Sequence, residues 1–147
     1  MLKDALIEIY ARDLKKLQKE INLYADESKL WATSGEIPNS AGNLCLHLLG
    51  NLNHFIGALL GQNGYVRHRD LEFSDKGVPR DELNKMIDDT IEAVKNSLEK
   101  LSAEDFERDF PVEINDKIDK TGYVLIHLLT HFDYHLGQIN YHRRLLS

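Results

Sequence analysis

Apolar residues recur at steps of three and four along four stretches of the chain. Over residues 2–26 this spacing places an apolar stripe opposite a charged face, which is typical of an amphipathic helix. The same spacing predicts helices over residues 40–60, 81–101 and 121–146. The pattern therefore predicts four amphipathic helices that bury their apolar stripes against one another.

Glycine, proline and polar residues mark the connections between these helices. Ser40 or Asn39 can cap the second helix and Thr121 the last, because their side chains can accept hydrogen bonds from the unpaired amides of a first turn. Residues 62–79 have glycines near both ends and no clear period, so we expect a long loop there. Such a loop is either solvated or lies over a functional site.

The four helices, with long connections after the second and third, predict an all-α fold. We expect a four-helix bundle that forms a single domain over residues 1–147. A domain of this length buries roughly 70% of the surface that its unfolded chain exposes, so it needs no disulfide or structural metal to fold.

Charge and composition limit the classes of partner that the protein can bind. A formal net charge of -6 opposes binding to nucleic acid, which requires clustered lysine and arginine. No apolar run approaches the length of about 20 residues that crosses a membrane, so no membrane partner is expected. The single cysteine, Cys45, cannot form an internal disulfide, and the start of the chain lacks the apolar stretch of a secretory signal. We expect a cytoplasmic protein with Cys45 as a buried, inert thiol.

Histidines are concentrated in the last predicted helix, where "HLLTHFDYHLGQINYH" (127–142) holds four of the seven in the chain. His131 and His135 are four residues apart, so they project from one face about 6 Å apart along the axis and can converge on one ion. His47 lies on the apolar stripe of the second helix, where an unpaired imidazole would cost roughly 1–3 kcal/mol. The spacing alone leaves two interpretations open, a shared metal ion or histidines that pair within a helical core.

Other catalytic templates are absent. Phe132 follows His131 where the helix of a zinc protease carries a glutamate, and no Glu-x-x-His occurs, which excludes a carboxylate-bridged di-iron bundle. The chain also has no Cys-x-x-Cys pair, nucleophile elbow or glycine-rich phosphate loop. The histidines are therefore the main candidates for chemistry.

The second and last predicted helices, "NSAGNLCLHLLGNLNHFIGALLG" and "HLLTHFDYHLGQINYHRRLL", resemble the two signature segments of the DinB-like (DinB/YfiT-like) family of small metal-binding four-helix bundles. The resemblance covers essentially the whole chain, and its specific part is His47 together with His131 and His135, followed by Gly137 and Gln138. It implies a divalent metal ion, commonly zinc, nickel or iron, held by the three histidines with positions left open. It also implies a homodimer.

A metal at these ligands gives neighbouring polar side chains a role, because a metal-bound imidazole needs an acceptor on its other nitrogen. Asn51, His54, His127 and Gln138 are the candidates for orienting the ligands or a substrate. Members of the family often carry an arginine directly after the last ligand. Leu136 stands there in this chain, so anion binding is not expected at that position.

Three neutral imidazoles leave the full charge of a dication on the site, which can deprotonate a bound thiol. Together with the resemblance, this predicts a metal-dependent thiol S-transferase that activates a low-molecular-weight thiol toward a small-molecule electrophile. Two alternatives stay open. A metal-dependent hydrolase would use the same ligands, although no carboxylate lies at an obvious neighbouring position to move the proton. A noncatalytic metal or small-molecule binding bundle would need no further residues.

Overall fold

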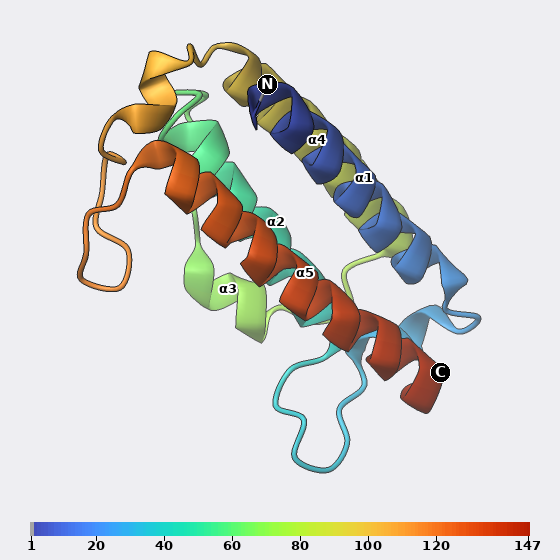
Figure 1. Ribbon diagram of the computed structural model, residues 1–147. Helices are drawn as coiled ribbons and strands as arrows, with labels where there is room; N and C mark the ends of the chain where they lie inside the picture. Colours follow the sequence, from blue (N-terminus) through green and yellow to red (C-terminus); the bar gives the residue numbers. More distant parts are fainter. Residues whose placement is uncertain (1) are drawn as a thin grey trace.

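The computed structural model describes residues 2–147, so Met1, the first residue of the predicted domain, lies outside the described part. This part is all-helical, which confirms the predicted class, and its long helices are α1 (Leu2–Leu23), α2 (Ala41–Leu52), α4 (Arg80–Glu99) and α5 (Thr121–Leu146). Helix α1 packs on α4 and α5, and α2 packs on α4 and α5 (Figure 1). None of the described helices is both long enough and apolar enough to cross a membrane.

The ends of the helices show which capping predictions were right. The Oγ atom of Ser40 accepts from the backbone N–H of Asn43 at 3.1 Å, which confirms Ser40 as the N-cap of α2. The prediction for Thr121 was wrong, because Lys120 precedes the first turn of α5 and Thr121 is the first helical residue. The backbone N–H and hydroxyl of Thr121 instead donate to the carbonyl of Arg108, at 2.8 and 3.0 Å. A tertiary contact has taken the place of a local cap.

Helix α2 continues into a π-helical segment, η2 (Asn53–Ala58). The side chain of Asn53 donates to the carbonyl of Leu49 and to the hydroxyl of Thr90 on α4, both at 2.8 Å. These bonds fix the point where the winding of the helix changes. A π turn rotates the residues that follow it relative to an ideal α-helix, so the far end of η2 presents different faces from those that the period of α2 predicts.

The prediction of a long loop over residues 62–79 was wrong in part, because the segment contains the short helix α3 (Arg69–Ser74). Six residues make fewer than two turns, too few for a helical period to be recognised in the sequence. The side-chain amide of Asn43 on α2 holds this helix in place by donating to the carbonyls of Glu72 and Asp75, at 3.0 and 2.7 Å.

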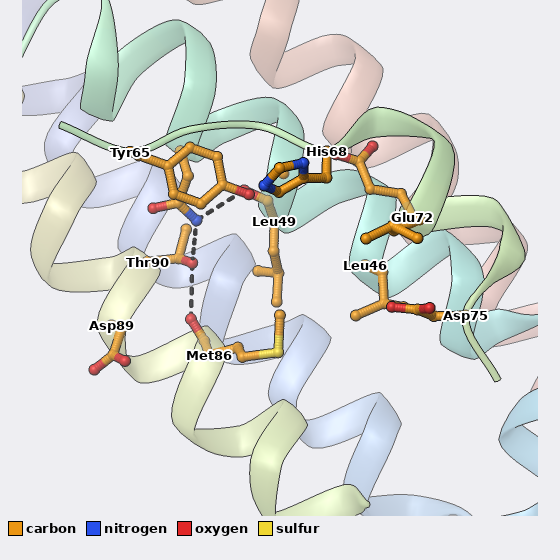
Figure 2. A pocket seen from close by; sticks show the side chains of 12 residues that line it. Leu46, Leu49, Tyr65, His68, Glu72, Asp75, Met86, Asp89 and Thr90 are labelled. Carbon is orange, nitrogen blue, oxygen red and sulfur yellow. Dashed lines mark hydrogen bonds between the residues drawn. The ribbon is translucent and has the colours of Figure 1, made fainter. Parts of the chain in front are cut away.

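Helix α3 and the chain before it cover part of α2 and α4. Together these elements enclose a cavity of about 330 Å³, whose wall includes Leu46, Leu49 and Met86 with Tyr65 and His68 (Figure 2). The side chain of Glu72 also reaches this wall. Most of residues 62–79 are exposed, but Glu72 is buried and Arg67, Phe73 and Val78 are half-buried, so the segment contacts the helices at these positions.

His142, near the end of α5, is buried in the core. Its Nδ1 atom lies 2.6 Å from the hydroxyl of Tyr24, and its Nε2 atom lies 2.8 Å from the carbonyl oxygen of Ala32. Because a carbonyl can only accept, Nε2–H donates to Ala32 and Nδ1 accepts from Tyr24. Both ring nitrogens are thus used in joining α5 to the chain after α1.

We expect His142→Ala to lower the free energy of unfolding by about 2–5 kcal/mol, because it leaves the buried Tyr24 hydroxyl and the Ala32 carbonyl unpaired and opens a cavity. Urea denaturation followed by circular dichroism measures this loss. Replacement of the exposed His68 by alanine is the control and should change stability by no more than about 0.5 kcal/mol. Equal stability of the two variants would contradict the structural role of His142.

Candidate metal centre

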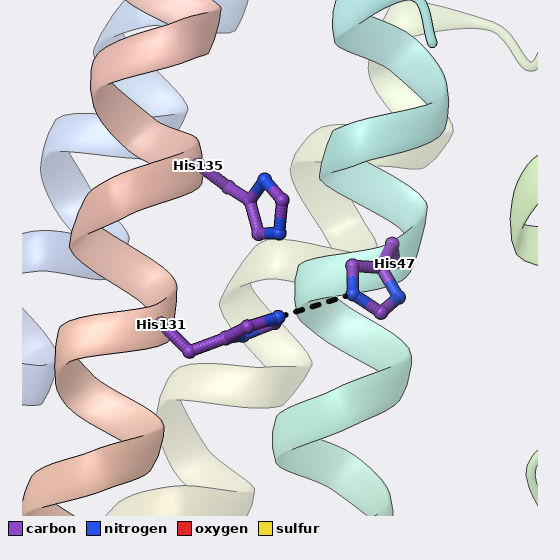
Figure 3. Close-up of side chains that lie close together, drawn as sticks. All are labelled: His47, His131 and His135. Carbon is purple, nitrogen blue, oxygen red and sulfur yellow. Dashed lines mark hydrogen bonds between the residues drawn. The ribbon is translucent and has the colours of Figure 1, made fainter. Parts of the chain in front are cut away.

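Three histidines from two helices meet at the contact between α2 and α5. His47 comes from α2 and is buried, and His131 and His135 come from successive turns of α5 and are half-buried. One nitrogen of each ring lies within 4.8 Å of the corresponding nitrogens of the other two, and the three side chains point toward one another (Figure 3). The structure therefore brings together the three residues that the sequence indicated as metal ligands.

The separation of one pair of nitrogens, on His47 and His131, matches that of two ligands on one metal ion. Nε2 of His47 lies 3.3 Å from Nε2 of His131. Zinc–nitrogen bonds of about 2.0–2.1 Å in tetrahedral geometry separate two ligand atoms by about 3.4 Å. Without an ion, the same approach accommodates an N–H···N hydrogen bond between the two rings. No carboxylate or thiol joins the three imidazoles in the described part of the chain, so an ion held there keeps a position for an outside donor.

His47 is oriented by a carboxylate. Its Nδ1 atom lies 3.1 Å from Oε1 of Glu72, which is supplied by α3. An ionised carboxylate can only accept, so Nδ1 carries the proton and the lone pair of Nε2 faces the other two histidines. Histidines that bind metals commonly donate their second nitrogen to a carboxylate in this way, which fixes the tautomer and raises the basicity of the ligand atom.

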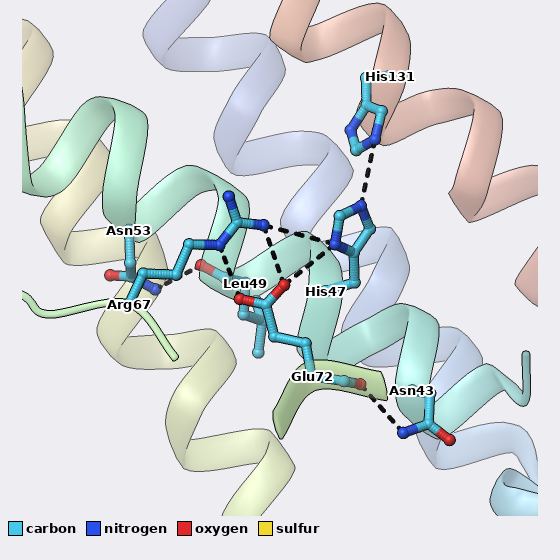
Figure 4. Close-up of polar contacts among 7 residues, drawn as sticks. All are labelled: Asn43, His47, Leu49, Asn53, Arg67, Glu72 and His131. Carbon is cyan, nitrogen blue, oxygen red and sulfur yellow. Dashed lines mark hydrogen bonds and ion pairs between the residues drawn. The ribbon is translucent and has the colours of Figure 1, made fainter. Parts of the chain in front are cut away.

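Glu72 is itself held by an arginine. Nε and Nη2 of Arg67 donate to the two carboxylate oxygens at 2.8 and 2.9 Å, a two-point contact between side chains that are both largely buried (Figure 4). Burial alone would raise the pKa of Glu72, but the hydrogen bonds from His47 and Arg67 outweigh it and hold that pKa below its usual range. Glu72 is therefore ionised at neutral pH and able to accept from His47.

The fit between α2 and α3 depends on a glycine. A Cβ atom at Gly50 would collide with the carboxylate of Glu72, so any side chain there would push the carboxylate away. Gly50 lies almost one turn after His47 on α2. The absence of a side chain at this position gives Glu72 the room to reach the ring of His47.

His135 has a partner on its own helix. Its Nδ1 atom lies 2.7 Å from Oε1 of Gln138, which can only accept, so Nδ1–H donates and Nε2 is free to bind an ion. Two buried polar atoms near the centre have no hydrogen-bond partner among the described residues, Nδ1 of His131 and Oδ1 of Asn51. Asn51 lies one turn after His47 on α2.

The protonation of the histidines suits metal binding. Burial, and then the charges that His135 and His47 carry when protonated, lower the pKa of His131 to about 4. Burial also lowers the pKa of His135. Both rings are neutral at pH 7, which is the form that binds a metal ion without first losing a proton.

The remaining candidates lie outside the group of three. His127 stacks on Tyr123 with ring centroids 6.5 Å apart, and His54 lies edge-on to Phe55 at 4.8 Å. Burial, followed by the charge of Arg67, lowers the pKa of His54. Cys45 is fully buried, and burial raises the pKa of its thiol to about 12, so it is not a nucleophile at neutral pH.

Sequence reasoning missed Glu72 and the role of Arg67 as its partner. Both lie in the segment that was predicted as a loop, and their spacing of five residues matches no helical pair. The only available signal was the need of a buried His47 for a partner on its second nitrogen. That need indicates an acceptor but does not say which of the many acidic residues provides it.

Comparison with known proteins places the chain among proteins of undefined activity. The family model described as "Protein of unknown function (DUF1572)" matches residues 4–147. No curated protein matches the chain. The match spans nearly the whole sequence, including α2, α3 and α5, which supply the site.

Proposed function

Because the chain belongs to the DUF1572 family, whose description gives no activity, we propose its function from the chemistry of the site. His47, His131 and His135 hold one divalent ion, zinc, nickel or iron, and the protein is a metal-dependent transferase that activates a small thiol. One observation carries this proposal: three imidazole nitrogens within 4.8 Å of one another, with His47 turned toward the others by a buried carboxylate.

The resemblance of α2 and α5 to DinB-like proteins supports the same conclusion. With it we propose that the four long helices form a DinB/YfiT-like bundle and that two copies associate as a homodimer in the cytoplasm. The exposed side of the first turns of α5 carries Tyr123 and Ile126, apolar side chains of the kind that a second copy can cover.

An ion bound by three neutral ligands would lower the pKa of a coordinated thiol, so that the thiol reacts as thiolate at neutral pH. The protein's own residues set the geometry. Glu72 and Gln138 accept from Nδ1 of His47 and His135, which leaves both Nε2 lone pairs available to an ion. Arg67 is paired with Glu72 and so contributes no free charge to a substrate. In the reaction the thiol would lose its proton to solvent, a sulfur–carbon bond would form, and the leaving group would depart with the electrons of the bond that breaks.

Hydrolysis is the less favoured use of this site. It requires a group that takes the proton of the attacking water, and the carboxylate that reaches the cluster, Glu72, is occupied by His47 and Arg67. A noncatalytic bundle that binds a metal or a small molecule would need only the three ligands.

The test uses untagged, metal-loaded protein with a panel of small thiols and 1-chloro-2,4-dinitrobenzene as acceptor. We expect thioether and chloride to form faster than with free thiol, and the gain to disappear after the metal is removed or in His135→Ala. Hydrolysis of 4-nitrophenyl acetate without thiol would instead support a hydrolase. Metal binding with neither reaction would support a binding protein and contradict the transferase.

A further inference from the structure

A second cavity, of about 420 Å³, lies on the outer side of His135. It is formed by the segment before α2, the first turn of α2 and the C-terminal half of α5. Its size falls within the range of about 300–1,000 Å³ that is usual for small-molecule sites. It is distinct from the cavity between α2, α3 and α4, which lies on the Glu72 side of His47.

The cavity and the metal centre share residues. His135 and Gln138 line the cavity, and the same two side chains make the 2.7 Å hydrogen bond that orients His135 as a ligand. A molecule in the cavity therefore lies directly beside one of the three ligands. Because the cavity and the metal centre share these residues, a molecule that reacts at the centre could bind with its nonreacting part in the cavity.

The lining of the cavity selects for a neutral, apolar group. Ile37, Leu44 and Leu145 supply aliphatic surface, and Tyr134 and Tyr141 supply aromatic rings. No lysine, arginine, aspartate or glutamate is among the described residues that line it, so a charged group would find no ionic partner there. His142 also lines the cavity, but both of its nitrogens are already bonded within the core.

We propose that this cavity binds the acceptor substrate, a neutral small molecule with an aromatic or branched aliphatic body, and presents it beside His135. The role as acceptor rests on the proposed function, whereas the binding of an apolar body does not depend on the metal. The segment 37–39 and the exposed rings of Tyr134 and Tyr141 would contact the body, and the reactive end would face the centre.

The experiment uses metal-free protein and benzyl alcohol as an unreactive probe. Methyl NMR spectra should show saturable shifts for Leu44 and Leu145, and benzylammonium and benzoate should bind at least about tenfold more weakly because their charge is not compensated. Ile37→Asp places a carboxylate in the cavity and should weaken benzyl alcohol binding at least about tenfold. The matched control is Ile118→Asp, which changes a similarly exposed isoleucine in another connection and should leave binding unchanged.

Absence of saturable shifts, or an equal response of the two aspartate variants, would overturn the proposal. So would a change of oligomeric state that Ile37→Asp causes in gel filtration and Ile118→Asp does not, because the face would then be a contact between copies. The proposed function is tested separately. If untagged protein holds no metal but binds benzyl alcohol, the proposed transferase is contradicted and the proposed binding cavity stands. If thiol transfer occurs without benzyl alcohol binding, only the proposal of the cavity is contradicted.

Discussion

Replacement of His131 by alanine is expected to reduce bound metal in untagged protein to background, whereas His142→Ala leaves the metal content unchanged. Nε2 of His131 lies 3.3 Å from Nε2 of His47, and its removal leaves only two imidazoles to hold an ion. Removal of an orienting partner alone typically weakens metal binding 10–100-fold, so loss of a ligand should exceed about 100-fold. Elemental analysis of protein purified without a histidine tag measures the result.

His142→Ala and His127→Ala serve as controls on the same helix. Both nitrogens of His142 bind to Tyr24 and Ala32, and His127 stacks on Tyr123 outside the group of three. Because His142→Ala is expected to be less stable, circular dichroism should first show that each variant is folded at the temperature of the assay. Equal metal content in His131→Ala and His142→Ala would refute the ligand assignment.

The helical spacing of His131 and His135 made them candidate ligands, and the resemblance of the second and last helices to a known family singled out His47 as the third. A 3.6-residue period places His131 and His135 on one face of α5. Helix α2 is buried on every side, so its period alone does not distinguish His47 from its neighbours. The packing of α2 on α5 brings His47 to that face of α5. Gln138 was predictable for the same reason as His131 and His135. Residues three apart on a helix are neighbours, and its side-chain oxygen accepts a hydrogen bond from His135.

The parts that sequence reasoning missed depend on tertiary contacts. Glu72 reaches His47 only because α3 folds onto α2, and a helix of six residues has too little period to be recognised. Thr121 has a side chain that could cap a helix, yet its hydroxyl donates to the carbonyl of Arg108 instead. In both cases the hydrogen-bond partner is far away in the sequence. The local pattern of residues carries no information about such a partner.

Glu72→Gln should weaken metal binding by about 10–100-fold while all three ligands remain in place. Glutamine keeps the size of the side chain but removes the negative charge that favours the protonated Nδ1 of His47, and it leaves the guanidinium of Arg67 without its two-point partner. Competition with a chelator of known affinity measures the change in dissociation constant. An unchanged constant would mean that Glu72 has no part in orienting His47.

Gly50→Ala tests the same arrangement without touching a charged residue. A methyl group at Gly50 would occupy the space of the Glu72 carboxylate, so the carboxylate must move away from His47, and we expect a loss of affinity similar to that of Glu72→Gln.

Gly137→Ala on α5 is the matched control for Gly50→Ala. No atom lies within 4 Å of a Cβ at Gly137, so this change should leave metal affinity unaltered and, by favouring the helix, raise stability by up to about 1 kcal/mol. If Gly50→Ala bound metal as tightly as Gly137→Ala, the contact between α3 and His47 would be structural alone, and the centre would depend on its three imidazoles without help from the carboxylate.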